Sequence, residues 1–464
     1  MKRFIFLIIA VMSSAILSAK EAEILAQNTI TEVIFYSPEI VRIVKTPADT
    51  EGNTRRSLVV TLTPQKGLEI DRTENSSAVT LKSKVLTVKV DKKTGLVQFL
   101  HKGKNLLKEK GYSFEERIEG PDKGSYRTNI IYQLDKDEPI YGLGAIQDGK
   151  LSHRGSTHWN MEQNNTQDYQ YVIQSIKGWG LFWDNYSRAH FIDNEEGMKF
   201  SAEVGDDIDY YFMYGGSADG VNSQMRKLSG QVPMFPLWTF GYWQCRERYK
   251  SVDELMEVVR WHRANNVPLD GIVQDWQYWG SNYTWNAMDF LAETFVNGRW
   301  MVDEVHRNNA HLMISIWASF GPQTIPFKEL EEKGLLYDFQ TWPQSGLSAF
   351  WPPRMDYPSG VRVYDALSPE AREIYWKSLK KLVDYDIDAW WMDASEPNIR
   401  DCTDMDYRKA LCGPTALGSS TEYFNTYSIV NADAIYNGQR KVDSDKRVFL
   451  LTRSGFAGLQ RYST

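Results

Sequence analysis

The sequence predicts an all-β sandwich followed by a β/α barrel. Two observations predict this fold. The first half of the chain carries short β-branched, aromatic or alternating segments between turn residues, and the second half alternates apolar strands with helical patterns. The pattern changes near Gln231-Val232-Pro233, and 464 residues leave room for two cores. We therefore expect the sandwich over residues 20–230 and the barrel over residues 231–464.

Three segments represent the predicted sandwich, at residues 57–62, 78–90 and 207–213. Each is rich in β-branched or aromatic residues, or alternates apolar with polar residues, as half-buried strands do. Turn signals such as Lys93-Thr94-Gly95 separate such segments. Short strands between repeated turns are typical of two packed antiparallel sheets.

The second half contains candidate strands at residues 237–243, 271–275, 312–317, 389–393 and 448–452. Helical patterns lie between them, such as residues 251–265, which Ser251 and Glu254 open as a capping box, and residues 369–385. This alternation predicts parallel β/α units.

The N-terminus has the pattern of a secretory signal. Lys2 and Arg3 precede a mostly apolar run at residues 4–17, and Ser18-Ala19 follows. This run is shorter than the roughly 20 residues that cross a bilayer as a helix. We expect a signal peptide over residues 1–19, no membrane span, and export to the periplasm or the medium. The alternative is a buried first helix.

Composition excludes several classes of partner and cofactor. The net charge of −7, without a basic block, argues against a nucleic-acid partner. The three cysteines form no C-x-x-C pair, although Cys402 and Cys412 could pair across a short loop or remain thiols. The seven histidines show no metal-binding motif, so neither a metal nor another cofactor is expected. The 16 Trp and 25 Tyr suit either sugar-stacking surfaces or aromatic cores.

The most informative segment is Asp388-Ala389-Trp390-Trp391-Met392-Asp393-Ala394-Ser395-Glu396-Pro397, an apolar strand that delivers a carboxylate at its C-terminal end. In a β/α barrel this end faces the active site, so Asp393 is the predicted catalytic nucleophile. Two further strands end in polar groups, Asp275 and Arg453. An arginine favours the ionised form that a nucleophilic carboxylate needs, and a second carboxylate can hold sugar hydroxyls.

Each of these side chains also has a purely structural explanation. The acids and the arginine could be strand-end caps or a structural ion pair, although three polar groups at matching strand ends make this less attractive. Trp317 also ends a candidate strand, where it could form an apolar wall against a sugar ring or belong to the core.

The order of the motifs resembles glycoside hydrolase family 31. The resemblance is carried by Gln274-Asp275-Trp276-Gln277-Tyr278-Trp279, by Trp390-Trp391-Met392-Asp393-Ala394-Ser395-Glu396-Pro397, and by the segment from Arg453 to Tyr462. Upstream, Tyr141-Gly142-Leu143-Gly144 and Gly178-Trp179-Gly180-Leu181-Phe182 also resemble the family.

This resemblance implies a retaining α-glycosidase with a mutarotase-like sandwich in front of an eight-stranded TIM-type β/α barrel. This chain has about five of the eight strands, so we expect an incomplete barrel with an open sheet edge. It implies the following roles: Asp393 as nucleophile, Asp275 as ligand of sugar hydroxyls, Trp317 and Trp391 as walls of the sugar pocket, Arg453 beside the nucleophile, and Glu396 in support. In the family, the last motif continues into a Trp-x-Gly-Asp whose Asp is the general acid/base. That Asp is expected about six residues beyond Thr464.

The same resemblance implies the substrate and the state of the chain. The motifs resemble most the α-xylosidases that act on xyloglucan oligosaccharides, with α-glucosidases and transglucosylases of the family as the alternative. Without the acid/base and the closing strands, we expect an incomplete enzyme of low solubility and little turnover. A non-catalytic carbohydrate-binding remnant is the alternative from another functional class.

Overall fold

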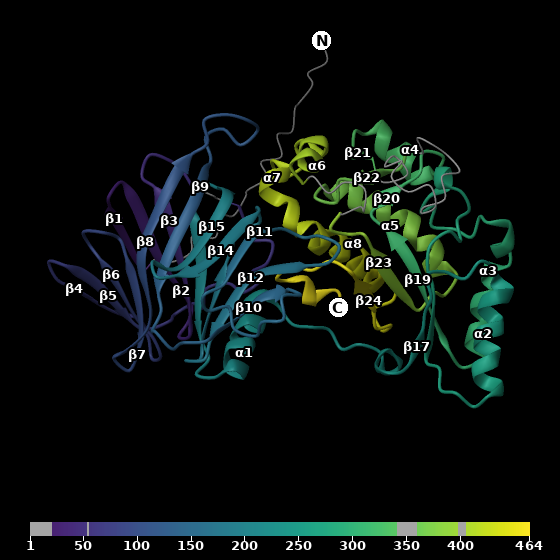
Figure 1. Cartoon of the computed structure of the whole chain (residues 1–464), viewed down its shortest axis with the longest axis horizontal. Helices are drawn as coiled ribbons and strands as arrows, with labels where there is room; N and C mark the ends of the chain where they lie inside the picture. The colour runs from purple at the N-terminus through teal and green to yellow at the C-terminus, as the bar shows by residue number, and fades with distance from the viewer. Residues whose placement is uncertain (1–20, 53–54, 341–359, 398–404) are drawn as a thin grey trace, which may run out of the picture.

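The computed structural model describes residues 21–52, 55–340, 360–397 and 405–464. Two antiparallel sheets form the N-terminal domain, and a parallel sheet covered by helices forms the C-terminal domain (Figure 1). The predicted signal peptide and Cys402 lie outside the described residues. Within the described ranges, none of the helices combines the length and the apolar character that crossing a membrane requires.

The first sheet of the N-terminal domain has seven strands, all paired antiparallel. In spatial order they are β1 (Ala22–Ala26), β2 (Thr29–Ser37), β3 (Ile40–Pro47), β16 (Ile208–Tyr214), β13 (Trp179–Trp183), β12 (Asp168–Ser175) and β10 (Ile140–Ala145). Helix α1 (Ala218–Ser229) follows β16, and Ser217 caps it by accepting a hydrogen bond from the backbone N–H of Gly220.

The second sheet has nine strands, which are again antiparallel. In spatial order they are β11 (Thr157–Met161), β14 (Ala189–Asn194), β15 (Gly197–Gly205), β9 (Tyr126–Gln133), β8 (Lys104–Glu116), β7 (Val97–His101), β6 (Thr87–Asp91), β5 (Ala78–Lys82) and β4 (Asp71–Glu74).

The core of the sandwich lies where the inner faces of the two sheets meet. Phe99 of one sheet stacks on Phe212 of the other, with ring centroids 4.0 Å apart. A fully buried ion pair also joins the sheets, because Lys45 Nζ lies 2.9 Å from Glu109 Oε2. Alternation of buried and exposed residues along strands such as β1 is the pattern that one buried face requires. The predicted all-β sandwich is confirmed.

One predicted strand of this domain is wrong. Residues 57–62 form no regular strand. Their backbone groups have other partners: the N–H groups of Thr61 and Leu62 donate to the Leu228 carbonyl, and the guanidinium of Arg461 donates to the carbonyls of Leu58 and Val59. Because these groups are used locally, no strand ladder forms, and the segment instead ties the sandwich to the C-terminal domain.

The other two sandwich predictions are confirmed with adjusted ends. Residues 78–90 contain β5 and β6, separated by a turn at Ser83, whose Oγ accepts hydrogen bonds from the N–H groups of Val85 and Leu86. Residues 207–213 correspond to β16.

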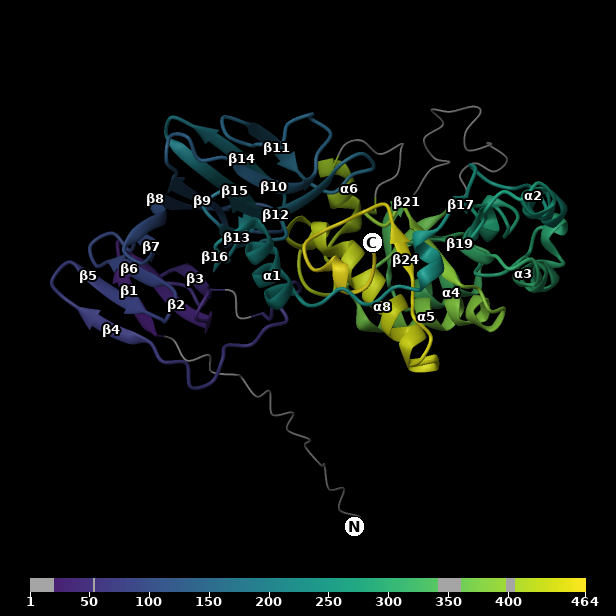
Figure 2. The ribbon, with the colours of Figure 1, turned by 90° about the horizontal axis from the view of Figure 1, so that it is seen from below.

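Within the described residues, the C-terminal domain contains a parallel sheet of five strands. In spatial order they are β17 (Trp243–Gln244), β18 (Gly271–Gln274), β19 (His311–Trp317), β23 (Ala389–Asp393) and β24 (Leu450–Thr452). Four of the five predicted strands are thereby confirmed. Strand β24 forms the edge of the sheet nearest the sandwich (Figures 1 and 2).

The predicted strand at residues 237–243 is mostly wrong. Its first part is the 3-10 helix η1 (Leu237–Phe240), and only the end of the segment pairs, as β17. Pro236 precedes η1, and the backbone N–H groups of Thr239 and Gly241 donate to the carbonyls of Pro236 and Trp238. These short-range hydrogen bonds curl the chain before it can enter the sheet.

Helices connect the parallel strands. The two predicted helices correspond to α2 (Val252–Ala264) and α5 (Pro369–Asp384), each opened by a serine side-chain cap at Ser251 or Ser368. The remaining elements of the domain are α3 (Gly298–Arg307), α4 (Ile325–Glu332), α6 (Met405–Cys412), α7 (Ser420–Tyr423), α8 (Tyr427–Val442), the 3-10 turns η2 (Asn282–Thr284), η3 (Glu293–Phe295), η4 (Phe424–Thr426) and η5 (Leu459–Arg461), and the small sheet of β20 (Ser319–Phe320), β22 (Arg362–Tyr364) and β21 (Leu336–Gln340).

Candidate active site

The register of the parallel sheet places the predicted site residues at the same level. Trp317 at the end of β19 is paired with Asp393 at the end of β23, and Trp391 is paired with Leu451 of β24. Since side chains alternate along a strand, Trp391 and Asp393 point to the same face of the sheet. The carboxyl ends of neighbouring parallel strands meet at one edge, which is where β/α enzymes place their active sites.

Asp393 contacts a backbone N–H and a guanidinium in this site. Its Oδ1 accepts a hydrogen bond from the backbone N–H of Ala394 at 2.8 Å, and Arg453 Nη1 lies 3.1 Å from the same oxygen. Burial raises the pKa of Asp393 to about 6, and the negative charge of Glu396 adds to the rise, while Arg453 holds it down. The carboxylate is therefore mostly ionised at neutral pH, as attack on carbon requires.

Arg453 forms its second and tighter contact with Glu396. The guanidinium donates from Nε to Oε1 at 2.8 Å and from Nη2 to Oε2 at 3.1 Å. Glu396 is only 1% exposed, so this two-pronged pair is well shielded from water. Glu396 thus fixes the orientation of the arginine, and the arginine presents its remaining nitrogen to Asp393.

Asp275 follows β18 and approaches the same place. Burial raises the pKa of Asp275 to about 7, and the charge of Asp393 is the next largest cause of the rise. The backbone N–H of Trp276 donates to Asp275 Oδ1 at 2.8 Å, which partly offsets the effect. Two acids that influence each other in a buried site hold one negative charge more easily than two.

The two predicted aromatic walls differ in their surroundings. Trp317 is 7% exposed, its indole N–H donates to Ser315 Oγ at 2.9 Å, and its ring meets the Trp285 ring edge to face at 4.8 Å. Trp391 is less buried and packs against a small group of buried apolar side chains of the parallel sheet, which includes Met313. Trp317 therefore stands as a fixed wall, and Trp391 has the more accessible surface.

Asp168 of the sandwich also approaches this site, although it is not among the residues predicted from the sequence. Burial raises the pKa of Asp168 to about 6, and the charge of Glu396 is the next cause, while the backbone N–H of Gly455 and the charge of Arg453 lower it. Asp168 thus lies close to the arginine–glutamate pair from the other domain. It stands at the end of the polar tract Gln163-Asn164-Asn165-Thr166-Gln167, which gave no signal of a site.

Asp168 also borders a cavity between the domains. The cavity has a volume of about 490 Å³, and Ser454 and Phe456 line it from the C-terminal side while Asn222 and Arg226 of α1 line it from the sandwich side. Asp393 and Asp275 are not among its lining residues. The cavity is therefore a neighbour of the strand-end site and separate from it.

The structure thus brings all six predicted residues to the carboxyl ends of three neighbouring strands, β18, β19 and β23, and the end of the edge strand β24. The arrangement offers a buried, largely ionised carboxylate beside a fixed guanidinium, a second acid, and two aromatic surfaces. Such a site can bind a polyhydroxylated ring and attack an electrophilic carbon on it.

Two family models match consecutive parts of the chain. The glycosyl hydrolases family 31 TIM-barrel domain matches residues 232–464, and the glycosyl hydrolase 31 N-terminal galactose mutarotase-like domain matches residues 31–191. The chain belongs to glycoside hydrolase family 31. The family resemblance and the mutarotase-like character of the sandwich are confirmed.

Individual members of family 31 match over almost the whole chain. An α-xylosidase of Saccharolobus solfataricus is 34% identical over 462 residues, which cover 96% of this chain and 56% of the relative. Alpha-glucosidase 2 of Bacillus thermoamyloliquefaciens is 26% identical, over 94% of this chain and 55% of the relative. The crystal structure of a family 31 α-xylosidase from Xanthomonas citri matches with a TM-score of 0.85 at 25% identity, over 95% of this chain and 64% of that one. The chain spans little more than half the length of the Saccharolobus and Bacillus relatives.

Proposed function

We propose that this family 31 chain carries the sugar-binding and nucleophilic part of a retaining α-glycosidase, with Asp393 as the nucleophile. The observation that supports it most is the chain of contacts from Glu396 through Arg453 to Asp393. A structural ion pair would satisfy the arginine with one acid. Here one nitrogen of the guanidinium is directed at a second, strand-end carboxylate, which stays largely ionised at neutral pH.

In the proposed reaction, Asp393 Oδ attacks the anomeric carbon as the bond from that carbon to the leaving oxygen breaks. The leaving oxygen takes a proton from a general acid, and a glycosyl ester forms on Asp393. A water molecule then gives its proton to the same group, now a base, and its oxygen displaces Asp393 from the sugar. Retention requires the two carboxyl groups to stand about 5–5.5 Å apart.

For the general acid/base we propose the Asp of a Trp-x-Gly-Asp motif beyond residue 464, in a longer protein. The match to about half the length of the relatives supports this proposal. Reading the coding DNA downstream of the Thr464 codon tests it. An in-frame continuation through such a motif is expected, and a stop codon directly after Thr464 would overturn this part of the proposal.

We propose an α-linked xyloside as the substrate, as in xyloglucan oligosaccharides. Support comes from the α-xylosidases among the relatives and from the similarity of the motifs around Asp275 and Asp393 to those of α-xylosidases. An α-glucoside is the alternative, since α-glucosidases also match. Glucose carries one hydroxymethyl group more than xylose, so steric exclusion in the pocket would decide between the two.

Labelling with 5-fluoro-α-xylosyl fluoride tests the nucleophile and the sugar together. The fluoride leaves without a proton donor, so the first step needs Asp393 but no general acid, and the ring fluorine slows release of the sugar. We expect mass spectrometry to find one fluoropentosyl group on the peptide that contains Asp393, and none in the Asp393→Asn variant. Label on a different carboxylate would overturn the assignment.

The glucosyl analogue serves as the comparison. Faster labelling by 5-fluoro-α-glucosyl fluoride than by the xylosyl reagent would favour the α-glucosidase alternative. Saturable binding of a xyloglucan oligosaccharide with no label from either reagent would instead indicate a non-catalytic carbohydrate-binding protein.

We also propose that the protein is exported by a signal peptide over residues 1–19. The basic start and the short apolar run support this. N-terminal sequencing of the protein from the periplasm or the medium should find a chain that begins at Lys20. Recovery of uncleaved protein from the cytoplasm alone would contradict it.

A further inference from the structure

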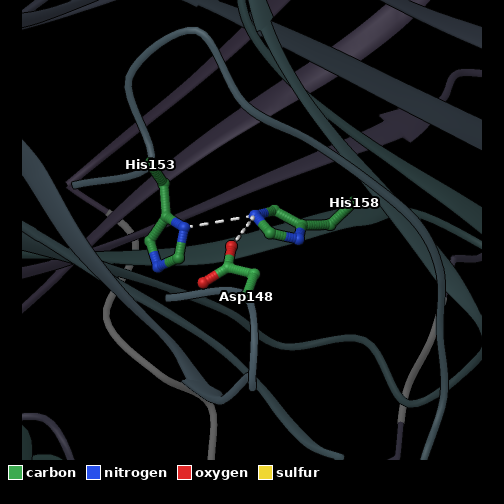
Figure 3. Close-up of side chains that lie close together, drawn as sticks. All are labelled: Asp148, His153 and His158. Carbon is green, nitrogen blue, oxygen red and sulfur yellow. Dashed lines mark hydrogen bonds and ion pairs between the residues drawn. The ribbon is translucent and has the colours of Figure 1, made fainter. Parts of the chain in front are cut away.

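Three potential metal ligands of the sandwich lie close together: Asp148 and His153 belong to the loop between β10 and β11, and His158 belongs to β11 (Figure 3). The donor atoms of Asp148, His153 and His158 all lie within 4.8 Å of one another. His153 Nδ1 is 3.1 Å from His158 Nε2, and His158 Nε2 is 3.9 Å from Asp148 Oδ2. The residues are spaced five apart in the sequence, which matches no common metal-binding motif.

The tautomer of His153 is set by a backbone contact. Its Nε2 lies 3.0 Å from the carbonyl oxygen of Gly142, and a carbonyl can only accept, so Nε2 carries the proton. In the neutral ring, Nδ1 is then the acceptor of the hydrogen bond between the two rings, and His158 Nε2 donates it (Figure 3). A metal ion would take the place of the shared proton, with His158 in its other tautomer. A histidine that donates one ring N–H to a carbonyl and turns the other nitrogen to a cluster is oriented as metal-ligating histidines are.

The donor set also suits a cation. Imidazole nitrogens and a carboxylate oxygen are ligand types that zinc takes in proteins, and here the three donor atoms come from one short stretch of chain.

We propose that Asp148, His153 and His158 bind a divalent transition-metal ion of the zinc class. Tetrahedral zinc with bonds of about 2.0–2.1 Å holds its ligand atoms about 3.3 Å apart. The two histidine nitrogens already have nearly this separation. Asp148 Oδ2 lies 3.9 Å from His158 Nε2, so it has to move closer to bind the same ion. The exposed loop that carries Asp148 can shift, whereas the two histidines, 4% and 8% exposed, are held by their surroundings. Water completes the fourth position.

The proposed role of the ion is to fasten this loop against the sandwich. The loop leaves β10 where Gly144 pairs with Tyr169 and Ala145 pairs with Asp168. His153 and His158 are 5 residues apart, and Asp148 is 5 residues before His153, so one ion would close two short loops. The ion would thereby hold the chain beside the strand that brings Asp168 to the active-site arginine.

Zinc titration of the purified, untagged protein tests the proposal. The protein is first stripped with EDTA, and ZnCl₂ is then added in a calorimeter, with Tm recorded before and after. We expect one zinc ion per chain, a higher Tm with zinc, and, with Co²⁺ in its place, the visible absorption of a tetrahedral nitrogen–oxygen site. His153→Gln and His158→Gln should each weaken zinc binding by about 100-fold or more, since loss of even an outer partner of a ligand costs about 10–100-fold.

Three further variants make the outcome decisive. His190→Gln alters a neighbouring histidine outside the cluster, whose Nδ1 accepts the N–H of Asn160, and should leave zinc binding unchanged. Cys245→Ser removes an exposed thiol that could bind zinc on its own, and should also leave one zinc per chain. If either cluster histidine variant fails to fold, Asp148→Asn tests the same site from the exposed loop. Zinc binding that is absent from the wild type, or that is equal in the cluster variants, would overturn the proposal.

Discussion

Arg453 Nη1 lies 3.1 Å from Asp393 Oδ1 and so joins the ends of the adjacent parallel strands β24 and β23. The same guanidinium holds Glu396 with its other two nitrogens. One cation therefore serves two acids. This explains why burial and the charge of Glu396 can still raise the pKa of Asp393 to about 6 although an arginine is in contact with it.

The first prediction concerns pH. Asp393 attacks only when ionised, so labelling by 5-fluoro-α-xylosyl fluoride should speed up as the pH rises through about 6, where the pKa of Asp393 lies, and then level off. The labelling rate, measured by mass spectrometry over a range of pH, checks this. A rate that does not change through that range would contradict the assignment of Asp393 as the reacting group.

The second prediction concerns Arg453→Gln. Removing the guanidinium takes away the charge that holds the pKa of Asp393 down, so the rise in labelling rate should move to higher pH. The buried Glu396 also loses its guanidinium, and the free energy of unfolding in urea should fall by about 3–5 kcal/mol.

The double variant Arg453→Gln with Glu396→Gln is the matched control. It removes the buried glutamate charge together with the cation, so it should recover most of the lost stability while labelling stays impaired. If the double variant is as unstable as the single one, the unpaired charge of Glu396 is not the cause of the lost stability.

The third prediction compares two acids on either side of β23. Asp388 precedes the strand and accepts hydrogen bonds from His306 Nε2 at 2.7 Å and from His311 Nδ1 at 3.0 Å. Burial would raise the pKa of Asp388, but these hydrogen bonds hold it well below its usual range, and the one to Asp388 raises the pKa of His306. The Asp388–His306 pair therefore stabilises the fold most strongly at pH values between the pKa of Asp and the pKa of His in the unfolded chain. Asp388→Asn should cost about 1–3 kcal/mol near pH 6 and less at higher pH, as His306 loses its proton.

Asp393→Asn should have the opposite effect on stability. A raised pKa of a buried acid means that its ionisation opposes folding, and this cost is fully present above the folded pKa of about 6. The variant should therefore be more stable than the wild type by about 1–3 kcal/mol near pH 8, and the gain should vanish below the unfolded pKa of Asp. Thermal and urea unfolding of both variants at the two pH values provide the check. Equal destabilisation by both variants would mean that Asp393 is a structural acid like Asp388.

The fourth prediction concerns Gly144 in β10. Its φ of +102° is unfavourable for other residues, and an added Cβ would lie 2.0 Å from the backbone carbonyl oxygen of Asp168. Gly144→Ala should lower the free energy of unfolding by at least about 2–3 kcal/mol and disturb the strand that carries Asp168. Gly103→Ala is the control, because Gly103 also has a positive φ, +78°, but an added Cβ there meets no atom within 4 Å. A similar loss of stability in both variants would show that strain alone, without the contact, explains the effect.

The sequence by itself determined the two-domain order, most of the barrel strands and the six candidate site residues. These features depend on local patterns: short apolar runs that end in Asp275, Trp317 or Asp393 have few alternatives to a buried parallel strand with a polar end. The family motifs added the expected roles of Trp391 and Glu396, because these two residues lie in the same contiguous segment as Asp393.

Only the tertiary structure decided which groups outside those motifs join the site and how neighbouring charges shift the pKa values of its acids. Residues 57–62 carry a strand pattern, but Arg461, about 400 residues later, takes their carbonyls, and no local signal announces such a partner. Asp168 reaches Glu396 and Arg453 from the other domain, and the pairing of β10 with β12 brings it there. The pKa values of Asp275 and Asp393 likewise depend on burial and on neighbours from other strands, which exist only once the chain has folded.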